Sequence, residues 1–151
     1  MADRRTEVHT ALADVHDEIL RLMDGLSAAQ MAGATANPGW SGHDTLAHLS
    51  SIEVRERAQA RSALEGTPYA PAEDVDTYNA RMIEERRAWS ADQIRAEFLR
   101  ERDSTLALLD GLQDPQFDLF LDHPRRGRMT VEQIFRHMTD HMRSHVAEML
   151  G

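Results

Sequence analysis

The sequence predicts an all-α protein, a four-helix bundle with one additional short helix. Three observations lead to this prediction. Apolar residues recur at intervals of three and four along the long segments, which is the period of a helix with one buried face. Capping residues stand before three of these segments, at Ser41, Ser90 and Thr130. No segment alternates well enough to require a strand, and residues 117–121 are only a weak exception.

The first half of the chain contains two long helices. The first covers about 6–25, and its inward stripe consists of Val8, Leu12, Val15, Ile19, Leu22 and Leu26. Residues 27–39 read as a short helical turn followed by a loop that ends in NPGW. Ser41 caps the second helix with Asp44 as its partner three residues later, and this helix extends to about Leu64. The breaker-rich EGTPYAP then ends it.

The second half contains the short helix and two further long ones. Residues 74–89 are predicted as a third, more polar helix. Ser90 with Gln93 begins a fourth helix that reaches about Leu112. Residues 114–128 are predicted to be irregular. Thr130 then caps the final helix, with Gln133 completing the capping box.

Composition limits the possible classes of function. At 151 residues, the chain is expected to form a single domain, residues 1–151, with a proper core. The net charge of −9, with arginine as the only basic residue type besides histidine, argues against nucleic acid as a partner. The absence of cysteine excludes disulfides and a cysteine nucleophile. No apolar stretch approaches the roughly 20 residues of a membrane span, and the first residues lack a signal peptide, so we expect a cytoplasmic protein without a membrane partner.

Three histidines, His137, His141 and His145, follow one another at intervals of four on the final helix. The predicted core seam of this helix consists of Val131, Ile134, Met138, His141, His145 and Glu148. His141 and His145 therefore occupy positions where Leu or Met is usual. His137 falls beside the seam, where it either supports the seam histidines without binding the metal itself or is exposed.

A single histidine on an apolar face is usually an ordinary core or boundary residue. Two successive seam histidines are harder to explain by packing, because burying both rings is costly unless something binds them. The pair therefore favours a metal site. It is not the metalloprotease motif, because no glutamate follows the first histidine of the pair.

His48 is the candidate for a third ligand. It precedes Ile52 by one helical turn, so it can face the bundle core. Two ligands from one helix and one from a neighbour leave an open coordination position. The remaining four histidines are expected on solvated surfaces, namely His9, His16, His43 and His123.

Three segments carry a family resemblance: PGWSGHDTLAHLS, VDTYNARMIEERRAWS and HMTDHMRSHVAEM. In this order and spacing they resemble the DinB/YfiT-like superfamily. It includes the metal-binding domain of mycothiol-dependent maleylpyruvate isomerases and the bacillithiol and mycothiol S-transferases. The resemblance implies a DinB-type bundle, usually a homodimer. It also implies a divalent metal ion, zinc or nickel, held by His48, His141 and His145.

The resemblance further implies an enzyme that uses a low-molecular-weight thiol, bacillithiol or mycothiol, as co-substrate. The thiolate would attack an electrophile or add reversibly to a double bond to permit isomerisation. The alternative is a non-catalytic, dimeric DinB-like stress-response or binding protein in which the metal is structural or absent.

Other residues have two interpretations each. Asn79 and Arg81, in the family-like VDTYNAR segment, are candidates for binding the thiol. Asn79 either orients a loop or lines the cleft. Arg81, like Arg86 and Arg87, either binds a carboxylate or belongs to a solvated face.

The loop before the final helix carries Arg125, Arg126 and Arg128. It is either a mobile arginine loop that closes over an anionic ligand or an ordinary solvated loop. For Trp40 we expect core packing where the preceding loop meets the second helix.

Overall fold

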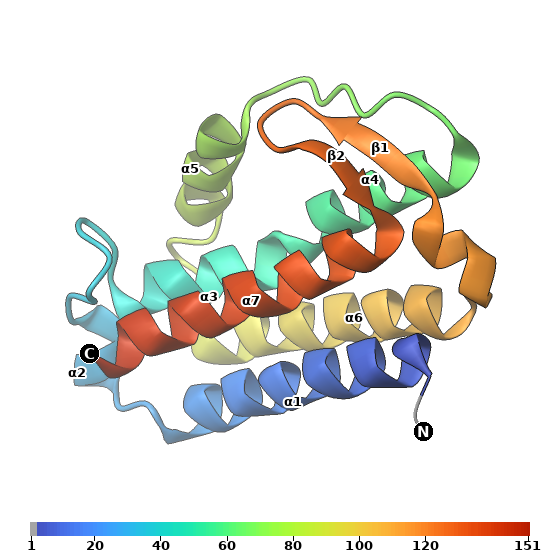
Figure 1. Cartoon of the computed structure of the whole chain (residues 1–151). Coiled ribbons are helices and arrows are strands. Elements are labelled where there is room, and N and C mark those ends of the chain that lie inside the picture. Colours follow the sequence, from blue (N-terminus) through green and yellow to red (C-terminus); the bar gives the residue numbers. More distant parts are fainter. Residues whose placement is uncertain (1–2) are drawn as a thin grey trace.

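Four long helical segments lie side by side in the computed structural model, which describes residues 3–151 (Figure 1). They are α1 (Arg4–Gly25), the consecutive α3 (Gly42–Ser51) and α4 (Glu53–Glu65), α6 (Ala91–Asp110) and α7 (Val131–Leu150). α1 packs against α6 and α7, and α3 packs against the same two helices. The predicted all-α four-helix bundle is confirmed.

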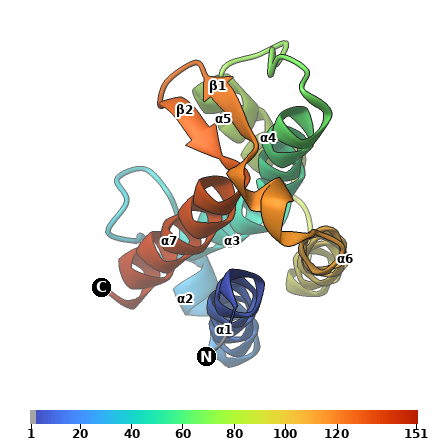
Figure 2. The same ribbon diagram turned by 45° about the vertical axis from the view of Figure 1, so that its right-hand side comes forward.

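Short elements connect these segments. α2 (Ala28–Ala32) precedes the loop into α3, and α5 (Val75–Glu85) lies between α4 and α6. The 3₁₀ helix η1 (Asp114–Asp118) and the strands β1 (Phe120–His123) and β2 (Gly127–Thr130) lie between α6 and α7. Figures 1 and 2 both show α5 and the β1–β2 hairpin on the α4 side of the bundle, away from α1. α5 and the hairpin thus cover only the side of the bundle that carries α4.

The predicted core stripes explain why the helices pack in this way. In α1, the four positions from Val8 to Ile19 are buried, while Leu22 and Leu26 at its end are half-buried. In α7, Val131, Ile134 and Met138 of the predicted seam are buried. Each such side chain contributes roughly 1.5–3 kcal/mol on leaving water. The capping boxes at Ser41, Ser90 and Thr130 are all formed as predicted, so the starts of α3, α6 and α7 are fixed locally.

The second predicted helix is interrupted at Ile52, which separates α3 from α4. The hydroxyls of Ser50 and Ser51 donate to the carbonyl of Ala47 at 3.0 and 2.8 Å. Serine side chains that bond the preceding turn of their own helix tend to bend it. The expectation of one unbroken helix to Leu64 was therefore wrong in this detail.

The third predicted helix ends earlier than expected, at Glu85 rather than Trp89. Arg86 leaves the helix and donates two hydrogen bonds of 2.8 Å to the Glu97 carboxylate on α6. This ion pair is buried, and the Arg86 guanidinium also lies over the Trp89 ring. A tertiary contact thus decides where α5 stops.

The predicted irregular segment 114–128 instead contains η1, β1 and the start of β2. β1 and β2 pair antiparallel, with Leu121 opposite Met129, and both of these side chains are buried. Gly127 has φ of +70°, a conformation that glycine adopts without strain, and it closes the turn. Of all the helices within residues 3–151, none is both long and apolar enough to cross a membrane.

Candidate metal centre

Three imidazole rings meet between α3 and α7. His48 comes from α3, and His141 and His145 come from successive turns of α7. The Nε2 atom of His141 lies 3.3 Å from Nε2 of His48 and 3.0 Å from Nε2 of His145. The structure therefore brings together the three histidines that the sequence singled out. His48 and His145 are buried, while His141 is half-buried.

The donor set fits a divalent metal ion. Two imidazole nitrogens bound to a tetrahedral metal at roughly 2.0–2.1 Å stand about 3.3 Å apart. The two Nε2–Nε2 distances of 3.3 and 3.0 Å are close to this value. Without a cation, converging nitrogen lone pairs would repel one another, because a neutral imidazole has only one proton to donate. The geometry is thus that of ligand atoms facing a common point.

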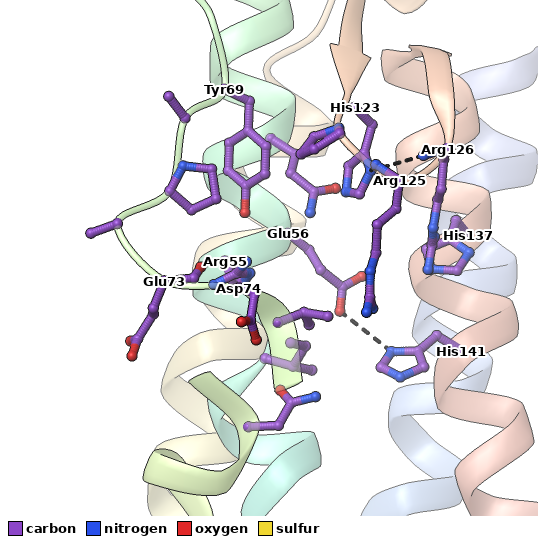
Figure 3. A pocket seen from close by; sticks show the side chains of 18 residues that line it. Arg55, Glu56, Tyr69, Glu73, Asp74, His123, Arg125, Arg126, His137 and His141 are labelled. Carbon is purple, nitrogen blue, oxygen red and sulfur yellow. Dashed lines mark hydrogen bonds and ion pairs between the residues drawn. The ribbon is translucent and has the colours of Figure 1, made fainter. Parts of the chain in front are cut away.

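Two carboxylates lie behind the outward nitrogens of the α7 histidines. Nδ1 of His145 is 2.8 Å from Oε2 of Glu148. Nδ1 of His141 is 3.7 Å from Oε1 of the buried Glu56 on α4 (Figure 3). Metal-binding histidines commonly direct their second nitrogen at a carboxylate, which fixes the tautomer and orients the ring. Both carboxylates therefore support Nε2 as the ligand atom.

The third histidine has an amide as its neighbour. Nδ1 of His48 and Oδ1 of Asn79 are both buried, and neither has a hydrogen-bond partner within residues 3–151. They are nevertheless complementary, since one can donate and the other accept. Asn79 is also close enough to oppose part of the fall in the pKa of His48.

The surroundings of the centre favour the neutral imidazole form of His48 and His145, which is the form that binds metal ions. Burial, followed by the charges of His141 and His145, holds the pKa of His48 well below its usual range. Burial and the charge of His141 also lower the pKa of His145. Metal ions bind neutral imidazole, so a depressed pKa removes the competition from protons. Burial raises the pKa of Glu56, which is partly offset by His141.

Trp40 closes one side of the centre. Its ring stacks on His145 at 5.7 Å with an interplanar angle of 17°, and it lies 5.1 Å from the His48 ring. The loop that carries Trp40 is tied to the end of α7, where the amide of Ala36 donates to the carbonyl of Glu148 at 3.0 Å. Trp40 is half-buried and packs as expected near the start of α3, against the histidines themselves.

The other side opens into a cavity of about 470 Å³. Its walls come from α4, the segment that follows α4, α5, the β1–β2 turn and α7, and His137 and His141 both line it (Figure 3). This volume lies in the range of ordinary small-molecule sites. His137 is half-buried and stacks on His141 at 5.9 Å. Burial and the charge of Arg126 lower the pKa of His137 to about 4, so its ring is neutral near pH 7.

The candidate binding residues fall into two groups. Asn79, Arg125 and Arg126 line the cavity. Arg81 is exposed and forms ion pairs with Glu73 and Glu85. It is not one of the residues within 3–151 that line the cavity. Arg128 lies over the Phe120 ring at 3.7 Å, on the surface of the hairpin.

Three of the four histidines expected on solvated surfaces are placed otherwise. His16 is fully buried, because α6 covers its side of α1 with Phe98, and its Nε2 lies 3.2 Å from Glu53. His123 lines the cavity, since the hairpin turns it inward. His43 is half-buried against the carbonyl of Trp89, at 2.9 Å. His9 is half-buried at the surface, where its Nδ1 lies 2.7 Å from Asp110.

Sequence reasoning missed most of the cavity wall. Glu56 and Arg55 lie on α4, whose sequence EVRERAQARSALE is so polar that no buried face is recognisable. Tyr69 lies in the breaker-rich connection. Glu148 could have been found, because it follows His145 by one turn on the same helix face.

Comparison with known proteins places this chain in a family. The model of the DinB superfamily matches residues 8–149. The chain belongs to the DinB superfamily. None of the curated proteins matches the sequence.

Several solved structures share the fold. YfiT from Bacillus subtilis is described as a probable metal-dependent hydrolase with an unusual four-helix bundle topology. It superposes with a TM-score of 0.82 at 18% identity, and the match covers 97% of this chain and 83% of YfiT. The mycothiol-dependent maleylpyruvate isomerase superposes with a TM-score of 0.83 at 10% identity. That match covers 99% of this chain but only 63% of the isomerase. An uncharacterised protein from Clostridium difficile 630 superposes with a TM-score of 0.78 at 8% identity, covering 99% of this chain and 95% of that protein. At such identities these matches establish the fold.

Proposed function

We propose that this chain is a metal-dependent enzyme that transfers a low-molecular-weight thiol, such as bacillithiol or mycothiol, to an electrophile. His48, His141 and His145 hold the divalent ion, zinc or nickel. The observation that carries the proposal is the convergence of three Nε2 atoms at the wall of a cavity large enough for a small molecule. The superfamily's mycothiol-dependent isomerase, with the same fold, supports thiol chemistry.

Each part of the site has a task in this reaction. A divalent ion held by the three histidines would lower the proton affinity of a bound thiol and so favour its thiolate form near neutral pH. Glu148 and Glu56 orient the α7 histidines, and Trp40 excludes water from the closed side. In the cavity, the thiol proton passes to solvent, the sulfur–carbon bond forms, and the leaving group departs with its bonding electrons.

A second candidate function is metal-dependent hydrolysis, in which water is the nucleophile. The description of YfiT as a probable metal-dependent hydrolase favours it, and the same open cavity would admit water. The homodimer remains part of our proposal, and light scattering of the purified protein tests it.

The decisive experiment is a transfer assay with zinc- or nickel-loaded protein and monochlorobimane, in which chloride is the leaving group. We expect the rate with bacillithiol or mycothiol to exceed that of the thiol alone, and His48→Ala to remove the excess. His9→Ala, a change far from the cavity, is the matched control. No excess rate with any thiol, together with turnover of an ester, would replace the transferase by the hydrolase. Inactivity in both assays would favour a non-catalytic protein.

A further inference from the structure

The cavity beside the histidines contains two arginines that have no carboxylate partner. Arg55 donates to the main-chain carbonyl of Glu73 at 3.1 Å and lies over the Tyr78 ring at 5.1 Å. Within residues 3–151, the Arg126 side chain has neither a hydrogen bond nor an ion pair. Arg126 is an exposed residue. Burial of part of its side chain lowers its pKa, which the nearby charge of Glu56 partly offsets. A guanidinium that lines a cavity without a hydrogen bond to the protein can bind an external anion.

The acidic side chains that line the same cavity are already engaged. The Glu73 carboxylate is bonded to Arg81. Asp74 caps α5, accepting from the amide of Thr77 at 2.8 Å. Glu56 is the exception, because neither of its buried carboxylate oxygens has a hydrogen-bond partner within residues 3–151, but burial raises its pKa and so favours its uncharged form. The cavity therefore presents unpaired positive charge, although the whole chain carries a net charge of −9.

A second unpartnered group points to the same kind of ligand. The hydroxyl of Tyr69 is buried, and within residues 3–151 nothing accepts its hydrogen bond. Figure 3 shows the Tyr69 ring reaching into the cavity, where it stacks beside His123 at 5.9 Å. Buried polar groups in proteins are nearly always satisfied. Figure 3 shows Tyr69 and Arg126 on opposite sides of the cavity, so a ligand with oxygen atoms at separate positions could bond each of them.

These groups lie close to the histidine centre. The charge of Arg126 acts on the pKa of Glu56 and of His137, two residues that contact His141. Figure 3 shows Arg126 beside His137 on the wall that also carries His141. A small molecule bound by Arg126 would therefore lie near the histidines.

We propose that the cavity binds a carboxylate-bearing ligand, with Arg126 as the residue that binds its carboxylate. The inference rests on the proposed function, because only that function implies that the same ligand also carries a reacting atom, either the sulfur of a thiol or an electrophilic carbon. A bidentate guanidinium–carboxylate pair supplies both affinity and orientation. The carboxylate can belong to the thiol or to the electrophile, and each source has its own arm in the test.

The first arm compares the binding of 3-mercaptopropionate and its neutral amide to zinc-loaded full-length protein by titration calorimetry. We expect the carboxylate to bind about tenfold more tightly, as a charge-assisted pair should. Arg126→Gln should remove this preference. Arg128→Gln, a change on the same hairpin whose side chain lies over Phe120, should retain it. Equal melting temperatures for the two variants would show that both fold.

The second arm compares kcat/KM for 4-chloro-3-nitrobenzoate and its amide with a thiol that has no carboxylate. If the preference for the carboxylate over the amide depends on Arg126 in the first arm, the carboxylate belongs to the thiol. If it depends on Arg126 in the second arm, the carboxylate belongs to the electrophile. Absence of the preference in both arms, or its persistence in Arg126→Gln, overturns the inference. Arg126-dependent binding without any transfer would leave the carboxylate site standing and remove the proposed function.

Discussion

His16 and His141 each face a glutamate of α4, and the two pairs differ in what surrounds them. His16 of α1 lies 3.2 Å from Glu53, both side chains are fully buried, and Phe98 packs against the histidine ring. His141 faces Glu56 at 3.7 Å, but its other nitrogen meets those of His48 and His145, and it lines the cavity. Glu53 and Glu56 are one turn apart on the same helix.

The comparison shows that burial next to a carboxylate does not by itself make a functional site. The His16 pair has one histidine and no opening, so it can only contribute to stability. The His141 cluster combines convergent lone pairs with access from a cavity, and both are needed for a ligand to bind and react. The predictions below test this contrast, beginning with the largest expected effect.

Removing a converging histidine should abolish metal binding. We expect about one zinc or nickel ion per chain in the purified protein, and nearly none in His141→Ala or His48→Ala, because three ligands are the minimum of such sites. Elemental analysis measures this. His16→Gln is the matched comparison and should keep its metal. Equal metal content in the parent protein and in His48→Ala would remove His48 from the centre.

Breaking the closed pair should destabilise the fold without affecting the metal. His16→Leu leaves the Glu53 carboxyl group buried without this hydrogen bond, which costs about 1–3 kcal/mol. The double variant His16→Leu/Glu53→Leu should recover most of this loss, since neither polar group remains buried. Urea unfolding followed by circular dichroism gives both values. A loss below about 0.5 kcal/mol in the single variant would contradict the buried hydrogen bond.

The carboxylate behind His145 should tune metal affinity more gently. Glu148→Ala removes the acceptor for Nδ1, and we expect a 10- to 100-fold weaker affinity for zinc, as is typical of such supporting residues. Competition with a chelating dye measures the change. Glu132→Ala, on the first turn of the same helix, is the control and should bind zinc normally. An unchanged affinity in Glu148→Ala would mean that the carboxylate does not orient the ring.

The smallest effect concerns the closed side of the centre. Because Trp40 stacks on His145, its fluorescence should change when zinc binds. The signal should persist in Trp89→Phe, since Trp89 lies with Arg86 elsewhere, and should vanish in Trp40→Phe. We expect Trp40→Phe to lose no more than about 1.5 kcal/mol of stability, as another aromatic ring fills the space. A signal that depends on Trp89 instead would contradict the stacking.

Much of the fold could be predicted from the sequence, because the signals that predict a helix lie within a few residues of one another. The capping boxes at Ser41, Ser90 and Thr130 and the stripe from Val8 to Ile19 depend only on residues a few positions apart. The break at Ile52, the early end of α5 and the β1–β2 hairpin were not recognised. Each depends on side-chain bonds or cross-strand pairs that leave little periodic signal.

For the centre, the sequence by itself determined that His141 and His145 occupy core positions of the last helix and that His48 can face them. This follows because 3.6 residues per turn fix which side chains share a face. Only the tertiary structure decided that three Nε2 atoms converge, that Glu56 lies behind His141, and that Arg126 and Tyr69 line the cavity. These contacts join α3, α4, α7, the hairpin and the segment after α4, and their geometry exists only once the bundle has packed.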